Sequence, residues 1–190
     1  MIAHTLIRAT ALLTTISLGA DASAESFRLT SSDFTPGGAL NDEQAFDGMG
    51  CTGGNVSPAL RWSGAPAGTR SFALLLHDPD APTGGAGWWH WIAYDIPAHT
   101  TELPKGAGKP DGSAMPAGAK SVANDYGTPG YGGPCPPAGD KPHRYVFTLY
   151  ALKVDKLELP PGAHAPVVGF VVNANTIAKA SVTGMYGRAR

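Results

Sequence analysis

The chain has 190 residues with a formal net charge of −1, and 43% of the residues are hydrophobic and 15% charged. This length favours a single domain, and this composition excludes a disordered chain because enough apolar surface is present to build a core. The sequence has no basic stripe for a phosphate backbone, so nucleic acid is not an expected partner. The 25 glycines and 17 prolines favour short strands joined by many turns over long helices.

The first 24 residues have the three parts of a secretory signal peptide. Arg8 provides a positive charge, residues 9–20 form a mostly apolar run, and Ala22 and Ala24 place small residues at a cleavage site. The apolar run is too short to span a bilayer, and a buried N-terminal helix is the alternative interpretation. We expect cleavage after Ala24, a single mature domain over residues 25–190, a periplasmic or secreted protein, and no membrane span.

Strand patterns separated by turn patterns follow along the mature chain. Residues 71–77 contain a continuous apolar run that is typical of a strand buried on both faces, and Pro97 ends the next strand because proline lacks a backbone donor. The segments 32–57, 98–118 and 125–141 are expected to be mainly loop. In chain order, strands are expected at residues 26–30, 59–63, 71–77, 89–96, 120–124, 144–152 and 180–186.

One helix is expected near the C-terminus, beginning close to Val167. Alanine is frequent there, and several side chains recur near helical spacing. These residues are Val168, Val171, Val172, Asn175, Ile177 and Ala178. With the strands, this helix predicts a mainly β fold with little helical structure.

A pair of carboxylates follows the buried strand over residues 71–77. The sequence HDPDAP at residues 77–82 places Asp78 and Asp80 at alternate positions, which in an extended segment point to the same side. Such a pair could face a ligand. The alternative is a structural turn in which the aspartates accept hydrogen bonds from backbone amides.

An aromatic cluster begins the next strand, with the sequence GWWHW at residues 87–91. Trp88 or Trp91 could wall a pocket in which His90 is the polar group. The alternative is that the tryptophans pack on the core and that His90 is a hydrogen-bonded structural residue.

The expected loop over residues 125–141 contains the sequence GYGGPCPP at residues 130–137 and is followed by HRY at residues 143–145. Glycines expose backbone amides that can bind an anion, and prolines stiffen a loop so that less entropy is lost on binding. The alternative is a surface Ω-loop.

The sequence contains two cysteines, Cys51 and Cys135. An even number of cysteines in an exported protein suggests a disulfide. Two free cysteines remain the alternative, because the sequence does not show whether the pair lies within bridging distance.

The combination and order of these segments resemble the phosphatidylethanolamine-binding protein (Raf kinase inhibitor protein) family, and its bacterial YbhB/YbcL-like branch in particular. The resemblance rests on residues 54–58, 78–82, 88–91, 130–137 and 143–145. It implies a β-sandwich with a large central sheet, a smaller sheet and one or two short helices. It also implies one small pocket for phosphate, phosphorylethanolamine head groups or similar anions. Its wall would comprise Asp78, Asp80, Trp88, His90, Gly133, Pro136, Pro137, His143 and Tyr145.

The resemblance implies a protein that binds a small anionic or phosphorylated ligand and needs no cofactor. The signal-peptide pattern adds export, and the lack of a catalytic motif or an obvious nucleophile favours a non-catalytic protein. His90, His143 and Tyr145 would donate hydrogen bonds, with backbone amides near Gly133. The two aspartates would orient histidines and favour their protonated forms, or one would receive an ammonium group. The alternatives are a protein-interaction or protease-inhibitor-like module and a metal-dependent hydrolase that uses the Asp/His cluster. A homodimer is an open alternative, and no protein partner is indicated.

Overall fold

The computed structural model describes residues 26–190, so the expected signal peptide lies outside the described residues. Within this described range the elements are one helix and ten strands, and several of the strands are only two residues long. In chain order they are β1 Arg28–Ser31, β2 Asp47–Gly48, β3 Cys51–Thr52, β4 Leu60–Ser63, β5 Ser71–Asp78, β6 Trp88–Pro97, β7 Glu102–Leu103, β8 Lys120–Ser121, β9 His143–Leu152, α1 Ala165–Asn175 and β10 Thr176–Tyr186.

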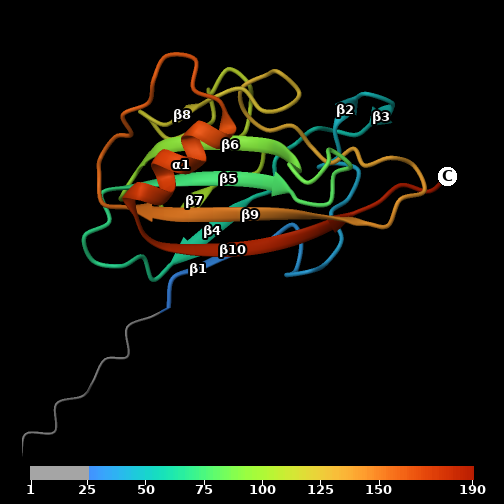
Figure 1. The fold of residues 1–190 in the computed structure, drawn as a ribbon. Helices are drawn as coiled ribbons and strands as arrows, with labels where there is room; N and C mark the ends of the chain where they lie inside the picture. Colours follow the sequence, from blue (N-terminus) through green and yellow to red (C-terminus); the bar gives the residue numbers. More distant parts are fainter. Residues whose placement is uncertain (1–25) are drawn as a thin grey trace, which may run out of the picture.

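A five-stranded antiparallel sheet with the order β10-β9-β5-β6-β8 forms the centre of the molecule (Figure 1). A three-stranded sheet with the order β1-β4-β7 packs on one face, and α1 covers the other. Strands β2 and β3 form a small separate hairpin. This arrangement confirms the predicted fold class, a mainly β sandwich with a large sheet, a smaller sheet and a short helix.

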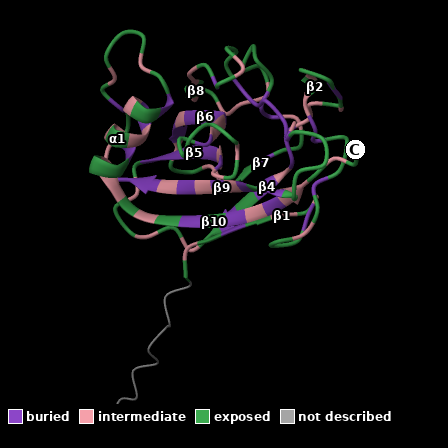
Figure 2. Cartoon of the chain, turned by 45° about the vertical axis from the view of Figure 1, so that its right-hand side comes forward, coloured by how far each residue is buried: buried purple, intermediate pink, exposed green. Residues whose placement is uncertain are grey.

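The central sheet is buried on both sides because β5 carries apolar side chains at every position from 72 to 76. Phe72, Leu74 and Leu76 enter the core between the two sheets, while Ala73 and Leu75 enter the core beneath α1. Strand β9 instead alternates between buried and less buried residues (Figure 2). The continuous apolar run in β5 is the pattern expected for a central strand with both faces covered. The alternation in β9 is the pattern expected for a strand with one face better covered than the other.

The predicted helix is present but ends earlier than expected. Ile177 and Ala178 lie in β10 and not in the helix, because the backbone turns extended at Thr176 (φ −74°, ψ 131°). From there, Thr176 pairs with Leu152 and the chain continues along β9. Pairing with a strand already in the sheet therefore overrides the local helical pattern.

Several short elements differ from the prediction. The expected strand at 120–124 is reduced to β8, and β2, β3 and β7 lie inside segments expected to be loops. A strand of two residues contains no period that a sequence pattern can reveal. The remaining strand predictions agree with the structure to within a few residues, apart from the early start of β10.

Candidate functional site

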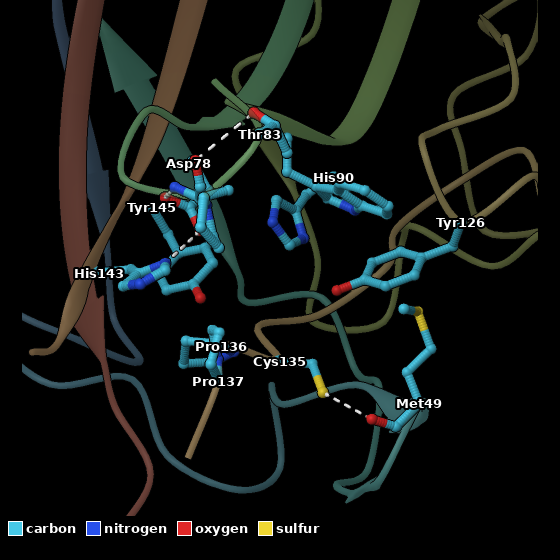
Figure 3. Close-up of a pocket in the computed structure, with 13 residues that line it drawn as sticks. Met49, Asp78, Thr83, His90, Tyr126, Cys135, Pro136, Pro137, His143 and Tyr145 are labelled. Atoms are coloured by element: carbon cyan, nitrogen blue, oxygen red, sulfur yellow. Dashed lines mark hydrogen bonds and ion pairs between the residues drawn. The ribbon is translucent and has the colours of Figure 1, made fainter. Parts of the chain in front are cut away.

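A cavity of about 180 Å³ opens at the end of the central sheet where β5 ends and β6 and β9 begin. It is smaller than the pockets that hold drug-sized molecules, which enclose roughly 300–1,000 Å³. Thirteen residues line it (Figure 3). They are Met49, Asp78, Ala81, Pro82, Thr83, Trp88, His90, Tyr126, Cys135, Pro136, Pro137, His143 and Tyr145.

His90 enters the cavity through an irregularity in β6. Leu76 of β5 pairs with Trp91 and His77 pairs with Trp89, so the register passes over His90. Such a β-bulge re-aims a side chain at the edge of a sheet. The His90 carbonyl accepts a hydrogen bond from the Gly132 amide at 2.8 Å, which joins the bulge to the loop over residues 125–141.

Three buried polar atoms in the cavity wall have no hydrogen-bond partner among the described residues: Trp88 Nε1, His90 Nε2 and Tyr145 Oη. His90 is 2% exposed and Tyr145 is fully buried. Their rings meet edge to face with centroids 5.1 Å apart. Buried polar groups are almost always hydrogen-bonded, so three partnerless atoms around one small cavity call for a ligand or ordered water there.

The ring of His90 is neutral near neutral pH, because burial lowers the pKa of His90 to about 4. Its Nδ1 atom lies 2.7 Å from the Gly132 carbonyl, which can only accept, so Nδ1 carries the proton. Nε2 then has a lone pair. Asp78 favours the protonated ring, as expected for an aspartate beside a histidine, but the cost of burying the charge outweighs this attraction, so Nε2 of His90 is not a donor near neutral pH.

Asp78 positions His143 and the turn after β5 together. One carboxylate oxygen lies 2.8 Å from His143 Nδ1, so the imidazole donates to it. The other accepts from the amides of Asp80 at 2.8 Å and Ala81 at 3.1 Å. Both interpretations of this aspartate therefore hold: it is a turn residue and it orients a histidine of the cavity.

Asp80 points away from the cavity, contrary to the expectation that it faces the same side as Asp78. One of its oxygens accepts from the backbone amide and Nε of Arg144, both at 2.9 Å, and the other accepts from Nη2 at 2.6 Å. Hydrogen bonding to this guanidinium lowers the pKa of Asp80 to about 2. The strand ends at Asp78, so the alternation does not continue to Asp80.

All four oxygens of Asp78 and Asp80 already accept at least one hydrogen bond, from His143, Arg144 or backbone amides. An ammonium group of a ligand would therefore share a carboxylate oxygen with one of these donors.

Gly133 supports the cavity wall from behind and does not line it. Its amide donates to Asn55 Oδ1 at 2.8 Å and its carbonyl accepts from the Tyr126 hydroxyl at 3.0 Å. A Cβ atom there would lie 2.0 Å from the Gln44 carbonyl oxygen, so only glycine fits. Because the amides of Gly132 and Gly133 are both engaged, they are not the free donors that were expected.

A disulfide joins Cys51 to Cys135, a residue of the cavity wall, which confirms the predicted bridge. It ties strand β3 to the segment that carries Pro136 and Pro137, and the β2–β3 turn places Met49 at the rim. Met49 is 71% exposed. The bridge thus brings together two segments of the wall that are 84 residues apart in sequence.

Sequence reasoning did not identify six lining residues, of which Cys135 was expected only as a disulfide partner: Met49, Ala81, Pro82, Thr83, Tyr126 and Cys135. Ala81 and Pro82 lie in the HDPDAP run, so proximity to Asp78 could have indicated them. Tyr126 is the first aromatic residue of the long loop, and its ring stacks on Phe46 with centroids 3.8 Å apart. No sequence signal indicates Met49, because its place depends on the hairpin and the disulfide.

Among residues 26–190, no group of three or more His, Cys, Asp or Glu side chains is arranged to hold a metal ion. None of the helical structure in that range combines the length and apolar character that crossing a bilayer requires.

Comparison with known proteins places this chain in a family. The sequence profile of the phosphatidylethanolamine-binding protein family matches residues 30–187. The Escherichia coli protein YbcL is 49% identical over 165 residues, covering 87% of this chain and 90% of YbcL. E. coli YbhB is 44% identical over 159 residues, covering 84% of this chain and 99% of YbhB.

Two further comparisons extend this result. The crystal structure of E. coli YbcL, described as a member of the mammalian PEBP family, superposes with a TM-score of 0.82 over 85% of this chain and 98% of that one. A protein of Mycobacterium tuberculosis named as a lipoprotein, LppC, is 49% identical over 113 residues, which are 60% of this chain and 51% of LppC. The profile match and the identity to YbcL and YbhB agree with the fold, and this chain belongs to the phosphatidylethanolamine-binding protein family.

Proposed function

We propose that this chain is an exported, non-catalytic binding protein for a small anionic or phosphorylated ligand, which occupies the cavity at the end of the central sheet. The observation that carries the proposal is a set of three buried polar atoms that have no hydrogen-bond partner within residues 26–190: Trp88 Nε1, His90 Nε2 and Tyr145 Oη. A ligand that exchanges hydrogen bonds with them removes the cost of leaving them unpaired.

A small oxyanion suits both the size and the chemistry of the cavity. The indole N–H of Trp88 can only donate, and the hydroxyl of Tyr145 can donate or accept. An oxyanion leaving water needs such groups to replace its hydration shell. The apolar remainder of the wall, including Pro82, Pro136 and Pro137, keeps water away from these bonds and so strengthens them.

The state of the other lining residues supports binding without catalysis. Cys135 is bonded to Cys51, so it offers no thiolate. The hydroxyl of Thr83 donates its proton to the Gly87 carbonyl at 2.9 Å and not to a general base, so it is not activated as a nucleophile. Neither histidine has a serine, threonine or cysteine nucleophile as a hydrogen-bond partner among the described residues.

Export is supported by the pattern of the first 24 residues and by the disulfide, because disulfides persist in oxidising compartments. The similarity to LppC, which is named as a lipoprotein, also favours a place outside the cytoplasm. Sequencing the N-terminus of the protein recovered from the periplasm or medium tests this point. A first residue of Glu25 is expected, and an intact Met1 would contradict it.

Isothermal titration calorimetry of the exported protein with phosphate and with O-phosphorylethanolamine tests the binding function. Saturable binding is expected, and Tyr145→Phe should weaken it about fivefold, the effect of one hydrogen bond of about 1 kcal/mol. Tyr150→Phe is the matched control, since Tyr150 lies on β9 but packs beneath α1. The proposal would be contradicted if neither ligand bound, or if the two variants lost affinity equally.

A further inference from the structure

We infer that the cavity selects an oxyanion that still carries a proton, such as inorganic phosphate or a phosphomonoester monoanion, over sulfate or a phosphodiester. The inference rests on the proposed function and adds to it the chemical class of the ligand. The group that makes the selection is Nε2 of His90, which offers the ligand a lone pair where an anion site ordinarily offers an N–H.

The hydrogen bond at the other side of the imidazole fixes its tautomer. Nδ1 of His90 lies 2.7 Å from the Gly132 carbonyl, and a carbonyl cannot donate, so the proton must be on Nδ1. Turning the ring over would replace this bond with a C–H contact. Nε2 is buried in the cavity wall and has no partner in the part of the chain that the structure describes, so its lone pair is available to a ligand.

Burial opposes the addition of a second proton to His90. His90 is 2% exposed, and the cost of burying the charged ring outweighs the nearby carboxylates and carbonyls that favour it. Asp78, the carboxylate that favours the charged ring most, already accepts from His143 and from two backbone amides. The titratable groups that face or surround the ring are Asp78 from β5, His143 and Tyr145 from β9, and Asp125 and Tyr126 from the loop.

The cavity therefore presents three hydrogen-bonding atoms with different roles. Trp88 Nε1 can only donate, Tyr145 Oη can donate or accept, and His90 Nε2 can only accept. A bare anionic oxygen against the Nε2 lone pair is repelled, whereas a P–OH group donates to it. Sulfate has the same tetrahedral shape as phosphate but no proton at neutral pH. A ligand that leaves a buried hydrogen-bonding group of the site unpaired loses far more affinity than a ligand that differs slightly in shape.

The same argument separates two sources of a phosphate group. A phosphomonoester has a second pKa of about 6, so it retains its P–OH in mildly acidic solution and loses it above that pH. Inorganic phosphate keeps a P–OH throughout this range. A phosphodiester, the linkage found in an intact phospholipid head group, has no P–OH at any of these pH values. The structure thus favours a free phosphate or a monoester over a lipid.

The first test compares phosphate and sulfate by calorimetry with the exported protein at about pH 7.5, where phosphate should bind at least about tenfold more tightly, equivalent to roughly 1.4 kcal/mol. His90→Gln should reduce this ratio to near one, because the terminal amide can turn its N–H to an anionic oxygen. His99→Gln, an exposed position outside the cavity, is the matched control and should keep the wild-type ratio. Equal affinities of the wild-type protein for the two ions would overturn the inference, whether or not the variants fold.

The second test compares O-phosphorylethanolamine with its diester, glycerophosphorylethanolamine, at about pH 5.5 and about pH 8, on either side of the monoester pKa. The monoester should bind several-fold more weakly at the higher pH, and the diester should not bind at either. Diester affinity equal to that of the monoester would overturn the inference while leaving the proposed function intact. Wild-type protein that binds none of the four ligands would overturn the proposed function itself.

Discussion

The hydroxyl of Tyr145 and Nε2 of His90 are buried in the cavity wall without a hydrogen-bond partner among residues 26–190. Where neither a ligand nor water pairs such an atom, it costs the folded protein about 1–3 kcal/mol. The surrounding fold is rigid enough to bear this cost, since Tyr145 lies in β9 between two strands of the central sheet. Side chains kept in an unfavourable state by their scaffold are more often binding groups than structural ones.

Replacing Tyr145 with phenylalanine should therefore raise the free energy of unfolding of the ligand-free protein by about 1 kcal/mol, because the unpaired hydroxyl is removed and the ring stays in place. The same variant should bind phosphate more weakly. Urea unfolding in a phosphate-free buffer measures the first effect. A fall in stability would show that the hydroxyl has a structural partner.

His90 should make the stability of the protein depend on pH. Its pKa is about 4 in the folded protein, against about 6.5 for an unfolded chain, so between these values the unfolded chain binds the extra proton. The contribution is complete above about pH 6.5 and is lost as the pH falls toward 4, with a total on the order of 3 kcal/mol. Denaturant unfolding across this range should show a steeper decline for the wild-type protein than for His90→Gln. Parallel curves would contradict the assignment.

The element that shapes the cavity is the junction between the β6 bulge and the loop over residues 125–141. The Gly132 amide and carbonyl hold the backbone and ring of His90, and Gly133 lies against Gln44. This close approach leaves no space for a side chain. The loop is therefore a rigid part of the wall, in spite of its high glycine content.

Gly133→Ala should lower the free energy of unfolding by more than about 2 kcal/mol, because the new Cβ would lie 2.0 Å from the Gln44 carbonyl oxygen and the backbone would have to move. Gly169→Ala in α1 is a matched control, since the nearest atom to its Cβ is 3.9 Å away. It should stabilise the protein by up to about 1 kcal/mol through helix propensity. Thermal unfolding of the two variants compares them, and a neutral Gly133→Ala would show that the loop is adaptable.

At the scale of the whole molecule, the disulfide closes a loop between residues separated by 84 positions. In the chain-entropy account, such a bridge stabilises a protein by about 4 kcal/mol. The double variant Cys51→Ala with Cys135→Ala should lose stability of this order and bind phosphate more weakly, since Pro136 and Pro137 lose their tie. Chemical unfolding and calorimetry of the double variant measure the two effects. An unchanged phosphate affinity would show that the wall is held without the bridge.

Much of this fold was predictable because its long strands carry strong patterns. The apolar run of β5, the alternation in β9 and the stop at Pro97 each follow from local chemistry. Seven of the expected wall residues meet in one cavity: Asp78, Trp88, His90, Pro136, Pro137, His143 and Tyr145.

What escaped prediction depends on contacts between distant segments. The partner of Asp80 is Arg144, 64 residues away, and the tautomer of His90 is set by Gly132 in another loop. The helix end at Thr176 is decided by pairing with Leu152, and the two-residue strands exist only beside their neighbours. Local periodicity contains none of this information.

Under the proposed export, the Cys51–Cys135 bridge also determines in which compartment the pocket is completed. With the proposed export, the newly made chain passes through a reducing cytoplasm in which this bond does not form. Until oxidation outside, the segment carrying Pro136 and Pro137 is not fastened to the β2–β3 hairpin. Under the proposed export, the pocket would therefore reach its full affinity for phosphate only in the compartment where the bridge forms.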